Sequence, residues 1–179
     1  MQNFTYPVTL TPGDSPGRFT VTFTDVPEAI TWGDGMKDTL WQAADCLEEA
    51  IAGRIRRGDV IPAPSKPRRG QRLVPVPAPM AAKAALYLAM REAGISNLEL
   101  ARRLGCDEKE VRRMLDPRHA TKLPRIQAAL ETLGKRLVLS MEEADYRASQ
   151  NRVTDSTIHA ARKTRLGTVN SVTEFCDGQ

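Results

Sequence analysis

Residues 94–115 read GISNLELARRLGCDEKEVRRML, a stretch that predicts two short helices joined by a turn at Gly105. Ser96 can cap the first helix, and Asp107 followed three residues later by Glu110 has the spacing of a capping box for the second. Glycine at the end of a helix permits a sharp turn. We therefore expect a tight helical hairpin that the sequence specifies locally.

The second helix of this hairpin has an apolar side and a charged side. Val111, Met114 and Leu115 fall on the side that would anchor it to a core. The outward side carries Glu108, Lys109, Arg112 and Arg113. A helix placed in this way can enter a DNA major groove, as in helix-turn-helix proteins. An ordinary helical hairpin with a solvated charged face would show the same pattern.

Helical spacing continues on both sides of the hairpin. Apolar residues recur at steps of three and four within residues 80–88 and again within residues 124–133. None of these helices is long enough to persist alone, so they must pack together. We expect one all-α helix-turn-helix domain over residues 79–140. Residues 141–179 are mostly polar without a sustained period and predict a disordered tail.

The front of the chain alternates apolar and polar residues instead. This alternation covers residues 4–10 and 19–23 and predicts two half-buried strands. The turn formers of residues 11–17 between them favour an antiparallel hairpin. An apolar stripe from Met36 to Ile55 then predicts a helix.

Signals at both ends of this helix set its bounds. Asp34 can cap its start, and Gly58 can end it. Beyond it, six of the 12 prolines fall within residues 62–79 and predict a stiff connector over residues 62–78. Within the connector, residues 73–76 have strand composition, although Pro75 confines such a strand to a sheet edge.

The predicted fold class is therefore α+β. A small antiparallel sheet with one packed helix occupies residues 1–78, and the helical domain follows it.

Charge divides along the 179 residues in the same way. Residues 1–60 have a net charge of −4, residues 61–78 of +4 and residues 79–140 of +5. An acidic front and a basic back favour two different partners, the second of them nucleic acid. The three cysteines are widely separated and predict neither a disulfide framework nor a zinc site. No apolar run is long enough for a membrane span and no signal peptide is evident, so we expect a cytoplasmic protein without a membrane partner.

Residues 80–135 resemble the Cro/repressor-like helix-turn-helix family. By that resemblance Asn97 matches a phosphate-contacting position, and Glu108, Lys109 and Arg112 match base-reading positions. Asp107 and Glu108 depart from the more usual Ser, Thr, Gln or Arg. We expect the phosphate contacts to come from the surrounding cations Arg102, Arg103, Arg113, Arg118 and Lys122. Because one such helix covers few base pairs, we expect a homodimer or a higher even oligomer on operator DNA.

Two stretches of the front half, residues 23–34 and 58–65, resemble the HicB antitoxin family, and the likeness extends over residues 4–140. It implies a partial RNase H-like domain that binds and blocks a HicA-type mRNA-cleaving toxin. It also implies a C-terminal module, either helix-turn-helix or ribbon-helix-helix, that represses the operon of both proteins. The four expected helices favour the former.

The toxin-binding residues are expected among Asp25, Glu28, Trp32 and Asp34. A toxin that cleaves RNA needs a basic face, which an acidic domain complements. A solvated helix face would explain the acidic residues equally well. Trp32 and Trp41 could each serve as interface anchors or pack in the core.

Two other functions compete with the antitoxin reading. An RNase H-like nuclease needs clustered carboxylates that begin with an acid inside its first strand, but residues 4–10 contain no acid, and His119 and His159 have no triad partners nearby. We therefore expect no catalytic residue, no metal and no other cofactor. The remaining alternative is a transcriptional regulator whose front domain senses a small ligand.

Overall fold

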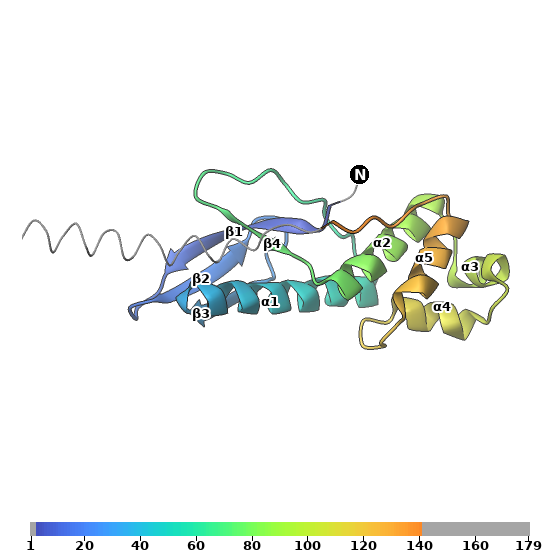
Figure 1. Cartoon of the computed structure of the whole chain (residues 1–179), viewed down its shortest axis with the longest axis horizontal. Coiled ribbons are helices and arrows are strands. Elements are labelled where there is room, and N and C mark those ends of the chain that lie inside the picture. The colour runs from blue at the N-terminus through green and yellow to red at the C-terminus, as the bar shows by residue number, and fades with distance from the viewer. Residues whose placement is uncertain (1–2, 141–179) are drawn as a thin grey trace, which may run out of the picture. The chain divides into compact units, whose positions relative to one another are not determined.

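Four strands and five helices follow one another along residues 3–140, the part of the chain that the computed structural model describes (Figure 1). In chain order they are β1 (Thr5–Pro12), β2 (Arg18–Phe23), β3 (Ile30–Asp34), α1 (Gly35–Arg57), β4 (Arg72–Pro75), α2 (Ala78–Ala93), α3 (Asn97–Leu104), α4 (Glu108–Leu115) and α5 (Leu123–Thr132). The α+β class is confirmed. The predicted tail, residues 141–179, lies outside the described residues, so its disorder stays a prediction.

The strands form one antiparallel sheet in the order β3-β2-β1-β4. Val8 of β1 lies opposite Phe23 of β2, which confirms the predicted hairpin. The edge position predicted for the strand containing Pro75 is confirmed as well, because β4 pairs only with β1. Strand β3 forms the other edge and was not predicted. The RNase H-like character of this sheet stays a prediction.

Helix α1 covers one face of the sheet. The alternate residues Tyr6, Val8 and Val21 are fully buried against Leu47 and Ile51 of the helix, as period-two strands under an amphipathic helix require. Gly58 ends α1 as predicted, and it does so in the left-handed conformation with φ +76°. The sequence pattern therefore placed the core of the front half correctly.

The start of α1 differs from the prediction. Asp34 is the N-cap residue, but its side chain makes no capping hydrogen bond. Its carboxylate instead accepts from Nε of Arg18 on β2 at 3.0 Å. The carboxylate of Asp38 accepts from the backbone N–H of Asp34 at 2.9 Å. The carboxylate of Asp34 therefore binds Arg18 on the neighbouring strand and does not cap the helix.

Helix α2 belongs to two cores. Met80, Ala84 and Tyr87 pack with the sheet and α1, whereas Leu86 and Met90 pack with the C-terminal helices. In Figure 1, α2 lies between α1 and the group formed by α3, α4 and α5. The predicted domain boundary between residues 78 and 79 stays a prediction. It falls at the start of α2, whose apolar side chains pack into both cores.

The four helices expected in the back half are all present. The Oγ of Ser96 accepts from the N–H of Glu99 at 3.2 Å, so the predicted cap of α3 is confirmed. Gly105 ends α3 with φ +62°. The prediction of a capping box at α4 is wrong, because the side chain of Asp107 makes no capping hydrogen bond and the carboxylate of Glu110 pairs with Arg125.

Candidate functional site

Helix α4 presents a charged outer side. Val111 and Met114 are buried, whereas Lys109, Arg112 and Arg113 are exposed. This division into an anchored side and an outward side is the one that the sequence predicted. It leaves the outer side of α4 free to meet a partner.

Ion pairs divide the cations of this surface into two groups. Arg112 donates from Nη2 to the carboxylate of Glu108 one turn earlier at 2.7 Å. Among the described residues, no ion pair engages the side chains of Lys109, Arg113, Arg118 and Lys122. Unpaired cations on an exposed surface are the groups that phosphate oxygens bind.

Three of these cations line one groove between α4, the following loop and the start of α5. Lys109, Arg113 and Lys122 line it together with His119 and Arg125, and its volume is about 390 Å³. Asp107 and Glu110 are its acidic lining residues, and Glu110 is already paired with Arg125. The groove is therefore suited to an anionic group.

A buried lysine holds the loop that borders this groove. Lys83 of α2 is 3% exposed, and its Nζ donates to the backbone carbonyls of Asp116 and His119. Burial lowers the pKa of its ammonium group. Lys83 was not among the predicted site residues, although a lone lysine among the alanines and leucines of an apolar helix was a usable signal.

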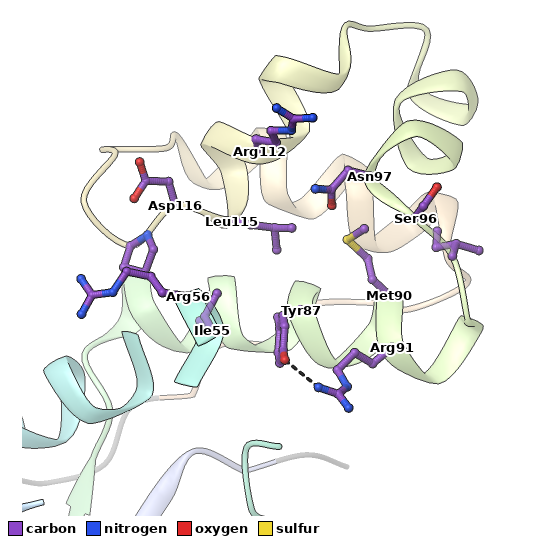
Figure 2. A pocket seen from close by; sticks show the side chains of 12 residues that line it. Ile55, Arg56, Tyr87, Met90, Arg91, Ser96, Asn97, Arg112, Leu115 and Asp116 are labelled. Carbon is purple, nitrogen blue, oxygen red and sulfur yellow. Dashed lines mark hydrogen bonds between the residues drawn. The ribbon is translucent and has the colours of Figure 1, made fainter. Parts of the chain in front are cut away.

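Asn97 lies apart from the groove. It is the half-buried first residue of α3, and with Arg112 it lines a second cavity (Figure 2). The structure thus brings Asn97 and Arg112 together at one place and Lys109, Arg113 and Lys122 at another. Arg118 lies in the loop after α4 and lines neither.

The open face of the sheet carries an exposed aromatic residue on its edge. Trp32 of β3 is 54% exposed, and the guanidinium of Arg18 lies 4.3 Å from its ring centroid. Arg18 also binds Asp34, and this hydrogen bond lowers the pKa of the Asp34 carboxyl. Ile30, two residues before Trp32, is 60% exposed. Trp32 and Asp34 are therefore joined through Arg18 in one surface cluster.

Trp41 on α1 is 65% exposed, so neither tryptophan packs in the core. The outward side of α1 around it is acidic, with Asp38, Asp45 and Glu49 exposed. Burial and the neighbouring carboxylates of Asp45 and Glu49 raise the pKa of Glu48. This side of α1 combines apolar area with negative potential.

The other two expected toxin-binding residues make internal contacts. The carboxylate of Asp25 accepts from the backbone N–H and the Oγ of Ser65, at 2.9 and 3.1 Å, and so fastens the connector. Glu28 pairs with Arg54 of α1. The structure gives both carboxylates a role in holding the fold.

Within residues 3–140, no group of three or more His, Cys, Asp and Glu residues could hold a metal ion. None of the helices there is long and apolar enough to cross a membrane.

Comparison with known proteins defines the class of this fold. A family model described as HicB_like antitoxin of bacterial toxin-antitoxin system matches residues 5–85. Antitoxin HicB of Escherichia coli (strain K12) is 38% identical over 136 residues, which cover 76% of this chain and 98% of that relative. Antitoxin HicB 1 of Photorhabdus laumondii is 37% identical over 142 residues, covering 79% of this chain and 90% of the relative.

The α+β fold and these relatives define an antitoxin of a bacterial toxin-antitoxin system. The chain belongs to the HicB antitoxin family.

Proposed function

We propose that this antitoxin neutralises a HicA-type mRNA-cleaving toxin through its front half and represses its own operon through α4. The observation that carries the proposal is the contrast between two exposed surfaces. The cluster on β3 and the outward side of α1 join apolar area to acidic groups, whereas α4 and the following loop carry unpaired cations. The antitoxin class requires a toxin, and the contrast supports DNA as the second partner.

The front surface has the composition of a protein interface. Trp32 and Ile30 supply exposed apolar area on an edge strand, and large aromatic residues are common anchors in interfaces. The net charge of −4 over residues 1–60 would steer a basic ribonuclease towards it. The exposed carboxylates of α1, Asp38, Asp45 and Glu49, provide the complementary charge.

Co-expression tests the first half of the proposal. The full chain should co-purify with the product of a short, basic reading frame beside its own gene, and should suppress RNA cleavage by that product. A chain that folds but neither binds this product nor protects cells from it would contradict the toxin assignment.

The back surface has the composition of a DNA interface. We propose that Lys109 and Arg112 reach base edges, because they project from the side of α4 opposite its buried anchors. Arg113, Arg118 and Lys122 would bind phosphates. The chain would act as a homodimer or a higher even oligomer, since two α4 helices can read two half-sites about one helical turn apart.

Fluorescence anisotropy tests this second half. Duplexes that tile the DNA upstream of the gene should include one that binds more tightly than scrambled duplexes of equal length at the same salt concentration. Equal affinity for all duplexes would contradict operator recognition.

We also propose that the chain catalyses no reaction itself. Strand β1 carries no acidic residue, whereas metal-dependent cleavage of nucleic acid needs clustered carboxylates. The purified protein should leave RNA, DNA and RNA/DNA hybrids intact with Mg²⁺ or Mn²⁺. Cleavage that disappears in an Asp25→Asn variant would overturn this view.

A further inference from the structure

A cavity of about 550 Å³ opens where the end of α1, helix α2 and the α3–α4 hairpin meet (Figure 2). Its volume falls in the range of small-molecule binding sites. Much of its wall is apolar, formed by Ile55, Tyr87, Met90, Ile95, Leu115 and Pro117. Such a wall can accommodate the hydrocarbon part of a ligand.

Three arginines from three different helices surround this apolar wall. Arg91 of α2 donates to the hydroxyl of Tyr87 at 2.7 Å, and Arg112 of α4 is held by Glu108. The side chain of Arg56 on α1 makes no hydrogen bond or ion pair to any residue that the structure describes.

The cavity offers little negative charge to offset these cations. Asp116 is the one carboxylate among its lining residues, and that carboxylate already accepts from the N–H of Arg118 at 3.0 Å. In Figure 2 the guanidinium of Arg56 lies at the rim of the cavity and points away from Tyr87 and Met90. A positive excess therefore adjoins an apolar wall, and Arg56 is the cation with no partner.

We propose that this cavity binds a small amphipathic anion, whose apolar body lies against the apolar wall and whose carboxylate or phosphate group draws in the flexible side chain of Arg56. The planar guanidinium of arginine suits these groups because it can donate two parallel hydrogen bonds to them. A neutral molecule of the same shape would contact the apolar wall but leave Arg56 without a partner. The charge distribution thus selects for an anion.

Occupation of the cavity would also affect DNA binding, a step that rests on the function proposed above. Asn97 and Arg112 line the cavity and are among the proposed DNA contacts. An anion that draws Arg112 towards the cavity would remove it from a base edge. Because binding linkage is reciprocal, the anion and the operator would then compete.

Isothermal titration calorimetry of the full chain tests the binding step, with 2-naphthoate as the probe. We expect saturable binding of one 2-naphthoate per chain and much weaker binding of the neutral analogue 2-naphthalenemethanol. Arg56→Gln should weaken 2-naphthoate binding about tenfold, because it removes a charged hydrogen-bonding partner. Arg69→Gln is the matched control, since Arg69 is exposed in the connector and does not line the cavity.

Three calorimetric results would overturn the proposed ligand class. These are the absence of saturable binding, equal affinity for the anion and the neutral analogue, and an equal loss in the Arg56 and Arg69 variants. In nuclear magnetic resonance spectra, 2-naphthoate should shift the signals of residues that line the cavity. Shifts confined to residues outside the cavity would also overturn the proposal.

Competition on DNA tests the second step. Added 2-naphthoate should weaken binding of the upstream duplex by the wild-type chain, and Arg56→Gln should need about tenfold more 2-naphthoate for the same effect, with 2-naphthalenemethanol as the control. An unchanged DNA affinity at saturating 2-naphthoate would overturn the competition while the calorimetric result for the cavity stands. A chain that binds no DNA under any condition would instead refute the proposed operator function.

Discussion

Arg54 and Glu28 form an ion pair with two hydrogen bonds, from Nε to Oε1 at 2.6 Å and from Nη2 to Oε2 at 2.9 Å. The pair joins the segment before β3 to the last turn of α1. Arg54 also donates to the carbonyl of Val60 at 2.6 Å, so its side chain is fixed from two directions. Hydrogen bonding to Arg54 lowers the pKa of the Glu28 carboxyl.

This ion pair predicts an acid-sensitive part of the stability. The pKa of Glu28 is lower in the folded chain than in the unfolded chain, so the pair stabilises the fold above the unfolded value, about 4.3. That stabilisation is lost as the pH falls through the folded value. Glu28→Gln should lower the free energy of unfolding by about 1 kcal/mol at neutral pH, a figure reduced for solvent screening because Glu28 is partly exposed.

Urea unfolding at a series of pH values measures this effect. The difference between wild type and Glu28→Gln should shrink in the acidic range. Glu49→Gln, which removes an exposed carboxylate with no ion pair to the described residues, should change the stability little. A constant difference at all pH values would show that the loss is not electrostatic.

Substitution of Lys83 should destabilise the protein strongly. Lys83→Met keeps the length of the side chain but leaves the carbonyls of Asp116 and His119 without their donor. We expect a loss of about 3 kcal/mol in chemical denaturation, since unsatisfied buried polar groups are costly. Lys122→Met, at an exposed position, is the control. Equal stabilities of the two variants would refute the positioning role of Lys83.

Gly33 marks the closest approach between β3 and α1. A Cβ atom at this position would lie 2.5 Å from the Cα and 2.6 Å from the backbone N of Thr39. Gly33→Ala should therefore lower the stability by about 2 kcal/mol or more, because the backbone must shift. Gly13→Ala is the comparison, since there the added atom meets only the flexible side chain of Arg18. A thermal shift no larger than that of Gly13→Ala would contradict the close approach.

The proposed DNA contacts should separate into two classes. Arg112→Ala should cost about 1 to 3 kcal/mol on the operator and weaken discrimination at one base pair. Lys122→Ala should weaken binding to all duplexes alike and reduce the slope against salt concentration by about one unit. Anisotropy at several salt concentrations measures both quantities. An unchanged operator affinity in a folded Lys109→Ala, Arg112→Ala double variant would show that α4 does not read the sequence.

Trp32 should be an anchor of the proposed toxin interface. Trp32→Ala should weaken the complex by about 2 kcal/mol, close to thirtyfold, because aromatic anchors dominate interface energies. Leu73→Ala provides the matched control, since Leu73 is an exposed apolar residue on β4 at the opposite edge of the sheet. Surface plasmon resonance with the co-purified toxin would measure both. Equal losses would show that the interface is not centred on β3.

The sequence predicted those elements whose signals are local. The C-terminal helices followed from their spacing of apolar residues, and the ends at Gly58 and Gly105 from glycine. The missing strand β3 is only five residues long and includes Gly33, and it is defined by its pairing with β2 across the loop of residues 24–29. The failed cap at Asp34 has the same origin, because Arg18 competes for its carboxylate.

The candidate sites show the same limit. Sequence spacing separated the outward from the buried side of α4, since one helix settles that division. The internal bonds of Asp25 and Glu28 depend on Ser65 and Arg54, 40 and 26 residues away, and no local pattern announces them. Asn97 and Arg112 line the same cavity only because α3 and α4 pack together, and the sequence alone does not show this.

The double role of α2 bears on how such proteins diversify. A recombination event that exchanged the C-terminal half at the proline-rich connector would remove Met80, Ala84 and Tyr87 from the core beneath the sheet. An exchange after α2 would retain them, but the incoming helices would have to fit Leu86 and Met90. If the two halves are exchanged separately between proteins, α2 must still fit both cores. Compensating substitutions should therefore accumulate on α2.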